Sequence, residues 1–159
     1  MNFLEQDWNF KLVLGYRELR ENPATVARNR SALLGALDKL LAGDVEGFWS
    51  IYSPDVVFHE ASCLPYGGAH HGLEATKEAV NRMSGVYAKL RTDFEQVLFG
   101  GDIALVYQTL TYQMKGTSET VSMPVAELYR FRHGKVIEWR AMYFDASIMA
   151  RAAAAALTN

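Results

Sequence analysis

Two glutamates occupy strand positions where the neighbouring side chains are apolar. Glu60 ends the segment "VVFHE", and if side chains alternate along a strand it shares a face with Val56 and Phe58. Glu127 lies in the middle of a second apolar set, formed by Val121, Met123, Val125, Tyr129 and Phe131. A lone carboxylate among apolar side chains is unfavourable unless it is protonated, paired or functional. Two such groups in different environments could divide the acid and base roles of proton-transfer chemistry.

Side chains that share these strand faces are expected to line an apolar pocket around the two glutamates. An aromatic wall suits a flat, apolar ligand, and a tyrosine in the loop "SCLPYGG" is placed to reach over the pocket mouth. The face assignments assume strands without a β-bulge, which would invert the alternation downstream. The expected ligand-binding residues are Tyr66, Trp139, Met123, Tyr129, Phe58 and Asp145.

Each of the two glutamates also has a purely structural interpretation. Glu60, at a strand end, could be a rim residue or the partner of an arginine. Glu127 could form a buried salt bridge with Arg140 or Arg91, which would not by itself stabilise the fold. The sequence leaves both alternatives open.

The sequence predicts neither a metal nor another cofactor. His59, His70 and His71 lack the spacing of a helical histidine pair or of a zinc site. The loop "PYGGAHHG" does not follow the GxGxxG pattern of a phosphate-binding turn.

Bulk composition is typical of one globular domain and excludes several classes of partner. The chain has 159 residues and a formal net charge of −2, so it has no basic surface for nucleic acid or an anionic membrane. The single cysteine, Cys63, favours a reducing compartment. The first residues lack the features of a signal peptide, and no apolar run approaches the ~20 residues of a membrane span. We therefore expect a cytoplasmic protein.

Helical patterns are expected early in the chain and strand patterns late. Apolar spacing predicts helices over 28–42, 44–52 and 73–90, and a short helix containing Trp8, Leu12 and Tyr16. Gly43 is expected to end the first of these, and Asp44 to cap the next. A strand is expected at 56–61. After residue 90, four segments rich in β-branched and aromatic residues are separated by "GGD", "GTS" and "HG", which indicates an antiparallel meander.

This order of elements predicts the α+β class, with a curved, mostly antiparallel sheet covered by three helices that enclose a pocket. The expected organisation is a partly helical N-terminal extension over 1–26, one domain over 27–149 and an Ala-rich tail over 150–159.

Residues from about 31 to 149 resemble the NTF2-like, SnoaL-like superfamily, which includes ketosteroid isomerase. The resemblance rests on "LLAGDVEGFWSIYSPDVVFHE", on "HHG" before the third helix, and on "VAELYRFRHGKVIEWRAMYF". It implies a cone-shaped NTF2-like fold (a cystatin-like α+β roll). Compared with ketosteroid isomerase, Glu60 matches the proton-shuttling aspartate and Glu127 matches the protonated aspartate that binds the oxyanion. The oxyanion tyrosine of that enzyme is replaced here, at about Ala36, so Tyr66, Tyr129 or Tyr143 would have to supply a phenol.

The resemblance implies a cofactor-free isomerase, cyclase or dehydratase that acts on a small apolar carbonyl compound. Glu60 would abstract or shuttle a proton next to the carbonyl, and protonated Glu127 would stabilise the enolate. One alternative is an epoxide hydrolase similar to the limonene-epoxide enzymes, in which Asp145 resembles part of the site. The other is a non-catalytic module for ligand binding or dimerisation. The resemblance also implies a homodimer through the open sheet face, for which Leu110, Tyr112 and Leu128 are the expected interface residues.

Overall fold

The computed structural model describes residues 22–157, and the side chains of residues 22–154. The helix expected around Trp8, Leu12 and Tyr16 lies outside this range. The described helices are α1 (Pro23–Leu41), α2 (Val45–Trp49), α3 (Leu73–Val86) and α4 (Ala146–Leu157). The strands are β1 (Tyr52–Glu60), β2 (Gly68–His71), β3 (Tyr87–Gly100), β4 (Ile103–Met114), β5 (Thr120–Arg132) and β6 (Lys135–Tyr143). The predicted α+β class and curved sheet are confirmed.

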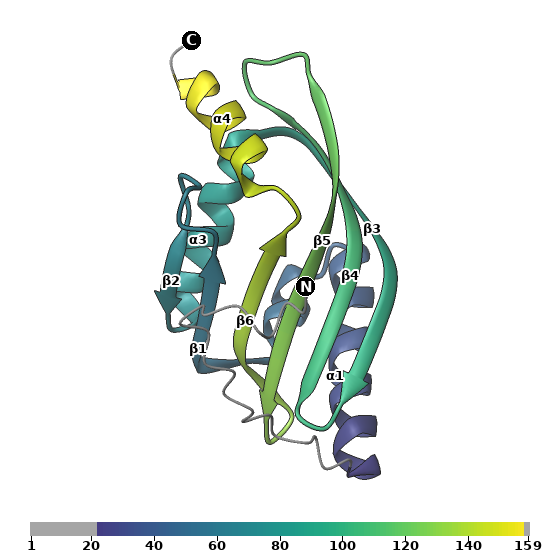
Figure 1. The fold of residues 1–159 in the computed structure, drawn as a ribbon. Coiled ribbons are helices and arrows are strands. Elements are labelled where there is room, and N and C mark those ends of the chain that lie inside the picture. Colours follow the sequence, from purple (N-terminus) through teal and green to yellow (C-terminus); the bar gives the residue numbers. More distant parts are fainter. Residues whose placement is uncertain (1–21, 158–159) are drawn as a thin grey trace, which may run out of the picture.

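One six-stranded sheet, in the order β2-β1-β6-β5-β4-β3, forms the frame of the molecule. All neighbouring pairs are antiparallel except β1 and β6, which run parallel. Helices α1, α2 and α3 lie behind the sheet in Figure 1, and α4 lies at its upper end. The main core fills the space between these helices and the inner sheet face, and includes Leu33, Phe48, Val56, Val106 and Trp139.

The first helices begin and end at residues whose chemistry explains their limits. Asn22 caps α1 by accepting hydrogen bonds from the backbone N–H of Ala24 and Thr25, and Pro23 occupies the first turn, where no N–H is needed. Helix α1 therefore starts inside the stretch that the sequence assigned to an N-terminal extension. The predicted stop at Gly43, whose φ is +81°, and the predicted cap at Asp44 are both confirmed.

The third helix is four residues shorter than the sequence predicted. Helix α3 ends at Val86, and Tyr87 and Leu90, expected on its apolar stripe, belong to β3 and pair with Met114 and Tyr112 of β4. Pairing along a 14-residue strand prevails here over local helix propensity. The short strand β2 was not expected, because its glycines and the preceding proline favoured an irregular loop.

Strand alternation separates the two sheet faces, with one irregularity. Between β5 and β6 the register shifts after the Arg130–Glu138 pair, and Phe131 then pairs with Val136. This bulge puts Val136, rather than Ile137, fully into the core.

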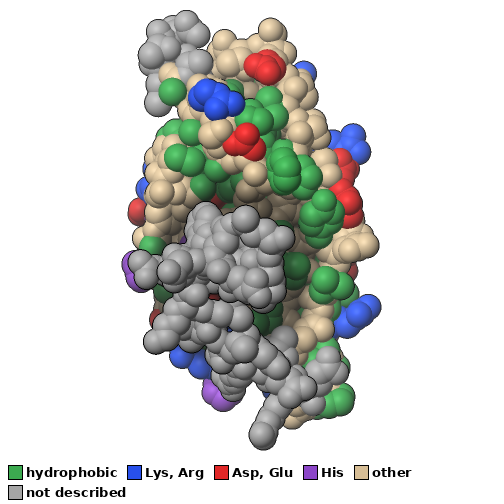
Figure 2. Space-filling view, in the orientation of Figure 1, with side chains coloured by type: hydrophobic (Ala, Val, Ile, Leu, Met, Phe, Trp, Pro, Cys, Tyr) green, Lys and Arg blue, Asp and Glu red, His purple; other side chains and the backbone are tan. Residues whose placement is uncertain are grey.

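The open sheet face differs from the expected interface at two positions. Leu110 and Tyr112 are buried, because the inner set of β4 is every second residue from Ala104 to Met114. The outer face instead exposes Leu98, Tyr107 and Met142. Figure 2 looks onto this side and shows hydrophobic side chains among polar and charged ones. A homodimer through this face stays a prediction.

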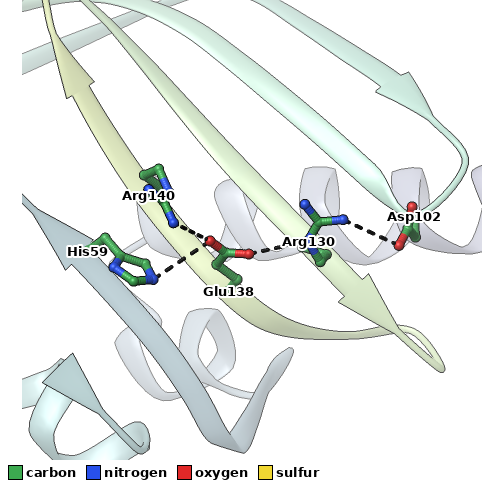
Figure 3. Close-up of polar contacts among 5 residues, drawn as sticks. All are labelled: His59, Asp102, Arg130, Glu138 and Arg140. Carbon is green, nitrogen blue, oxygen red and sulfur yellow. Dashed lines mark hydrogen bonds and ion pairs between the residues drawn. The ribbon is translucent and has the colours of Figure 1, made fainter. Parts of the chain in front are cut away.

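An ion-pair network crosses the same outer face (Figure 3). Glu138 of β6 accepts hydrogen bonds from Arg140 at 2.7 Å and from Arg130 at 3.2 Å, and the His59 ring lies 3.6 Å away. Asp102, in the β3–β4 turn, lies 3.7 Å from Arg130. These hydrogen bonds, with that from Arg140 the largest influence, lower the pKa of Glu138. Arg140 is therefore engaged on the side of the sheet opposite Glu127.

Candidate active site

A cavity of about 400 Å³ lies between the helices and the inner face of the sheet, within the size range of small-molecule sites. A smaller cavity of about 70 Å³ adjoins it toward the end of β1. The residues that line both are Met83, Leu90, Thr92, Gln108, Glu127 and Trp139. Glu60, Tyr87 and Tyr143 line the smaller cavity only. The two predicted carboxylates therefore meet in one composite cavity.

Glu60 is buried at the end of β1, with 8% of its surface exposed. The Tyr143 hydroxyl donates a hydrogen bond to its Oε1 at 3.0 Å, and its Oε2 has no partner among residues 22–154. Burial raises the pKa of Glu60 to about 8, and the charge of Glu127 adds to this rise, while the Tyr143 hydroxyl and the Ala61 backbone oppose it. The interpretation as an exposed rim residue is wrong, and no described arginine pairs with Glu60.

Glu127 lies in the middle of β5 and lines both cavities. The Tyr129 hydroxyl donates a hydrogen bond to its Oε2 at 2.5 Å. Burial raises the pKa of Glu127, while polar groups of Tyr129, Gln108 and Trp139 lower it. The alternative of a salt bridge to Arg140 or Arg91 is wrong, because Arg140 pairs with Glu138 and Arg91 pairs with Asp93.

Trp139 forms the aromatic wall that the sequence predicted between core and cavity. Its ring stacks on Phe58 with centroids 4.2 Å apart and on Tyr129 with centroids 5.8 Å apart. Trp139 and Tyr129 line the larger cavity, whereas Phe58 lines neither and supports Trp139 from behind. The indole N–H of Trp139 lowers the pKa of Glu127, but it makes no hydrogen bond of ordinary geometry with any described residue.

Besides Phe58, three predicted ligand-binding residues lie away from the cavities. Tyr66 is 1% exposed, so it cannot be a lid at the mouth, and its hydroxyl lies 2.5 Å from that of Tyr87. Met123 is buried in a second apolar cluster beneath α4. Asp145 follows the end of β6, where alternation no longer applies, and its carboxylate accepts hydrogen bonds from Ser147 at the start of α4. The functional roles of the residues that do line the cavity stay predictions.

Gln108 is the polar residue that sequence reasoning missed. It is buried, lines both cavities, and its Oε1 has no partner within the described part of the chain. The signal was present, since Gln108 interrupts the inner stripe of β4 as Glu127 interrupts that of β5.

The loop after β1 folds back tightly and depends on Gly67. The Leu64 N–H donates to the Ala61 carbonyl at 3.0 Å, and the Gly67 N–H donates to the Leu64 carbonyl at 2.9 Å. A Cβ at Gly67 would overlap the Ala61 carbonyl oxygen. This turn holds Tyr66 in the second apolar cluster.

We expect Gly67→Ala to lower the free energy of unfolding by about 1–3 kcal/mol, because backbone atoms would have to move. Urea unfolding would measure the change. The control is Gly35→Ala inside α1, where an added Cβ meets nothing within 4 Å. That variant should be more stable than the native protein by about 0.5–1 kcal/mol. Equal stability of Gly67→Ala and the native protein would contradict the tight turn.

The described residues contain no cluster of three or more His, Cys, Asp or Glu side chains that could hold a metal ion. Among the helices described, none is long and apolar enough to cross a membrane.

Comparison with known proteins agrees with this architecture. The protein-family model for the SnoaL-like domain matches residues 33–139 of this sequence. The chain belongs to the SnoaL-like family. No curated protein matches it.

Several solved structures share the SnoaL-like fold. An NTF2-like protein of unknown function from Burkholderia pseudomallei has a TM-score of 0.71 and 18% identity, covering 79% of this chain and 96% of its own. A candidate SnoaL-like polyketide cyclase from Jannaschia has a TM-score of 0.70 and 19% identity, covering 85% and 98%. TerC, crystallised with polyporic acid, has a TM-score of 0.69 and 20% identity, covering 80% and 98%. At these identities the likeness shows the fold alone.

Proposed function

We propose that this SnoaL-like protein is a cofactor-free enzyme that moves a proton next to the carbonyl group of a small, apolar compound. The observation that supports it is the meeting of Glu60 and Glu127 in one composite apolar cavity. Neither carboxylate is paired with a cation among the described residues, and burial raises the pKa of both. Two carboxyl groups with raised pKa values in one largely apolar cavity are suited to general acid–base catalysis.

In the proposed reaction, ionised Glu60 removes a proton from the carbon next to the carbonyl. The electron pair of the C–H bond forms the enolate, whose oxygen accepts a hydrogen bond from protonated Glu127. The Tyr129 hydroxyl donates to Oε2 of Glu127. In this proposal the donated proton is carried on Oε1. Glu60 then returns its proton to another carbon in an isomerisation. In a cyclisation the enolate carbon attacks a second carbonyl, whose oxygen takes the proton from Glu60. In a dehydration the enolate expels a β-hydroxyl group, which takes the proton from Glu60 and leaves as water.

The pH dependence of turnover tests this assignment. Because the pKa of Glu60 is about 8, its basic form is scarce at lower pH. With a β,γ-unsaturated ketone as probe, we expect kcat/KM to rise about tenfold per pH unit and to level off above about pH 8. A profile that levels off near the ordinary pKa of a glutamate would contradict the role of Glu60 as base.

The geometry of the cavity affects the two alternative functions, epoxide hydrolase and binding module, in different ways. The epoxide-hydrolase alternative relied on Asp145, which caps α4 outside the cavity. A non-catalytic binding module remains the main rival, and it predicts saturable ligand binding without turnover of enone or epoxide probes. Similarity to a candidate polyketide cyclase and to a protein crystallised with polyporic acid supports a small organic ligand in either case.

A further inference from the structure

The larger cavity opens to solvent on the helical side of the sheet. Most of the side chains that line it are buried or half-buried, but five are exposed and therefore mark the opening: Leu40, Val45, Asn81, Ser84 and Leu90. They come from the last turn of α1, the first position of α2, the second half of α3 and the edge strand β3. The opening therefore lies where these four elements meet.

The rim formed by these five residues is largely apolar. Leu40, Val45 and Leu90 are 38%, 50% and 43% exposed, although each is a large hydrophobic side chain. The two polar members lie together on α3, where the Ser84 hydroxyl donates to the Val80 carbonyl at 3.0 Å. Exposed apolar side chains that gather at one place commonly mark a binding site. Here they continue the apolar lining of the cavity out to its mouth, so a ligand that fills the cavity can also cover them.

The chemistry of the lining changes from the rim to the interior. Aliphatic side chains lie at the rim, whereas the buried aromatic side chains lie deeper: Phe48, Trp49, Tyr129 and Trp139. Gln108 and Glu127 share this interior on neighbouring strands, because Gln108 pairs with Val125 and Glu127 with Val106. An aromatic wall with polar groups beside it suits a flat head group, and an aliphatic rim suits a hydrocarbon chain.

The lining also indicates the charge of the ligand. No lysine, arginine, histidine or aspartate is among the described residues that line the larger cavity. Burial raises the pKa of Glu127, which favours the neutral form of this carboxyl group. A charged ligand group would lose its hydration in the cavity without gaining a counter-ion. The ligand is therefore expected to be uncharged.

We propose that the cavity takes an uncharged carbonyl compound with a flat head and an aliphatic chain that leaves through the rim. The head lies beside Trp139 and Glu127, and the chain passes Leu90 and Val45 so that its end reaches solvent. From β6 to β3 the path crosses three strand spacings, roughly 14 Å, which is longer than a single ring. This inference rests on the proposed function and deepens it, because it names the substrate class of the same cavity.

The test is a calorimetric titration with acetophenone and with acetophenones that carry para alkyl chains of increasing length. We expect the affinity to rise about three- to fourfold per methylene group while the chain lies in the cavity. It should level off once the chain passes the rim, because further methylene groups stay in water. An affinity that does not rise with chain length would overturn the proposal.

A hydroxyl group at the end of the alkyl chain tests where the chain ends. On a short chain this hydroxyl would be buried without a partner, so the affinity should fall about tenfold or more. On the longest chain it would reach solvent, and the affinity should be unchanged. Equal losses at both lengths would show that the chain does not leave through the rim, and would overturn the proposal.

Leu90→Thr and Leu98→Thr form a matched pair of variants on β3. Both leucines are exposed, but Leu90 lines the cavity, whereas Leu98 lies on the outer face of the sheet. Threonine is favourable in strands, so both variants should keep the strand. We expect Leu90→Thr to weaken binding of the longest chain about three- to tenfold and to leave the affinity for acetophenone unchanged. Leu98→Thr should change neither affinity.

Val45→Thr serves as a second rim variant if Leu90→Thr does not fold. It keeps the shape of the side chain at the first position of α2 and makes it polar. The same selective loss of affinity for the longest chain is expected. A folded rim variant with native affinity for this compound would overturn the proposal.

Binding and turnover separate this inference from the proposed function. Affinity that depends on chain length, without turnover of a β,γ-unsaturated ketone, would support the chain path and refute the proposed function. Turnover of that ketone, with affinities that do not depend on chain length, would refute the chain path alone.

Discussion

Glu60→Gln is expected to lower kcat for a β,γ-unsaturated ketone by about 10²–10⁴-fold, which is the usual contribution of a general base. Glutamine has the same shape as glutamate, and its carbonyl oxygen can accept the hydrogen bond of Tyr143. It cannot take a proton from the substrate. Steady-state kinetics would measure the loss, and circular dichroism would show whether the fold is retained.

The matched control is Glu138→Gln. Glu138 lies on β6, as a member of the outer network in Figure 3, and it does not line the cavity. We expect this variant to retain the native kcat, because only the outer face changes. A Glu60→Gln variant with native turnover would refute the assignment of Glu60 as base.

The second large effect is a fall in the stability of the native protein between about pH 4.5 and pH 8. The pKa of Glu60 rises from 4.5 to about 8 on folding, so the folded state binds more protons than the unfolded state in this window. The free energy of unfolding therefore decreases as pH rises, by on the order of 4 kcal/mol from this group. Glu127 contributes in the same direction. Urea unfolding at intervals from pH 4.5 to pH 9 would measure the slope.

Two variants separate the contribution of Glu60 from that of the surface. The free energy of unfolding of Glu60→Gln should depend much less on pH than that of the native protein. This variant should also be more stable than the native protein at pH 8, since no buried charge has to form. Glu138 affects the pH dependence of stability in the opposite direction, because hydrogen bonds from Arg140 and Arg130 lower its pKa. Glu138 stabilises the folded state above the ordinary pKa of a glutamate, and this stabilisation is lost in acid. Glu138→Gln should therefore lower the free energy of unfolding by about 1 kcal/mol at pH 7 and by little in acid. Parallel curves for Glu60→Gln and the native protein would show that Glu60 titrates as an exposed group.

The sequence was sufficient for features that depend on local chemistry and alternation. Turn residues separate the four long strands, and Gly43 and Asp44 mark the boundary between the first two helices. Apolar neighbours on alternate positions placed Glu60 and Glu127 on the inner face, because a single register decides the face of a whole strand. The same rule, applied to β4, would have identified Gln108.

Features that depend on tertiary pairing could not be predicted in the same way. Tyr87 has a helical neighbourhood in sequence, and only its pairing with β4 makes it a strand residue beside Glu60. Tyr66 resembles a loop residue at a cavity mouth, but the turn at Gly67 buries it. Asp145 fits the alternation of β6 only if that strand continues past Tyr143. In each case the deciding contact lies far away in the chain.

The parallel pairing of β1 with β6 has a consequence for how the protein folds. The antiparallel pairs from β3 to β6 close over short turns, whereas Glu60 and Tyr143 are 83 positions apart in the chain. Closing a longer loop costs more conformational entropy, so the antiparallel meander can form before β1 pairs with β6. The meander alone lacks Glu60, so the pair of carboxylates exists only once the most distant strands have joined.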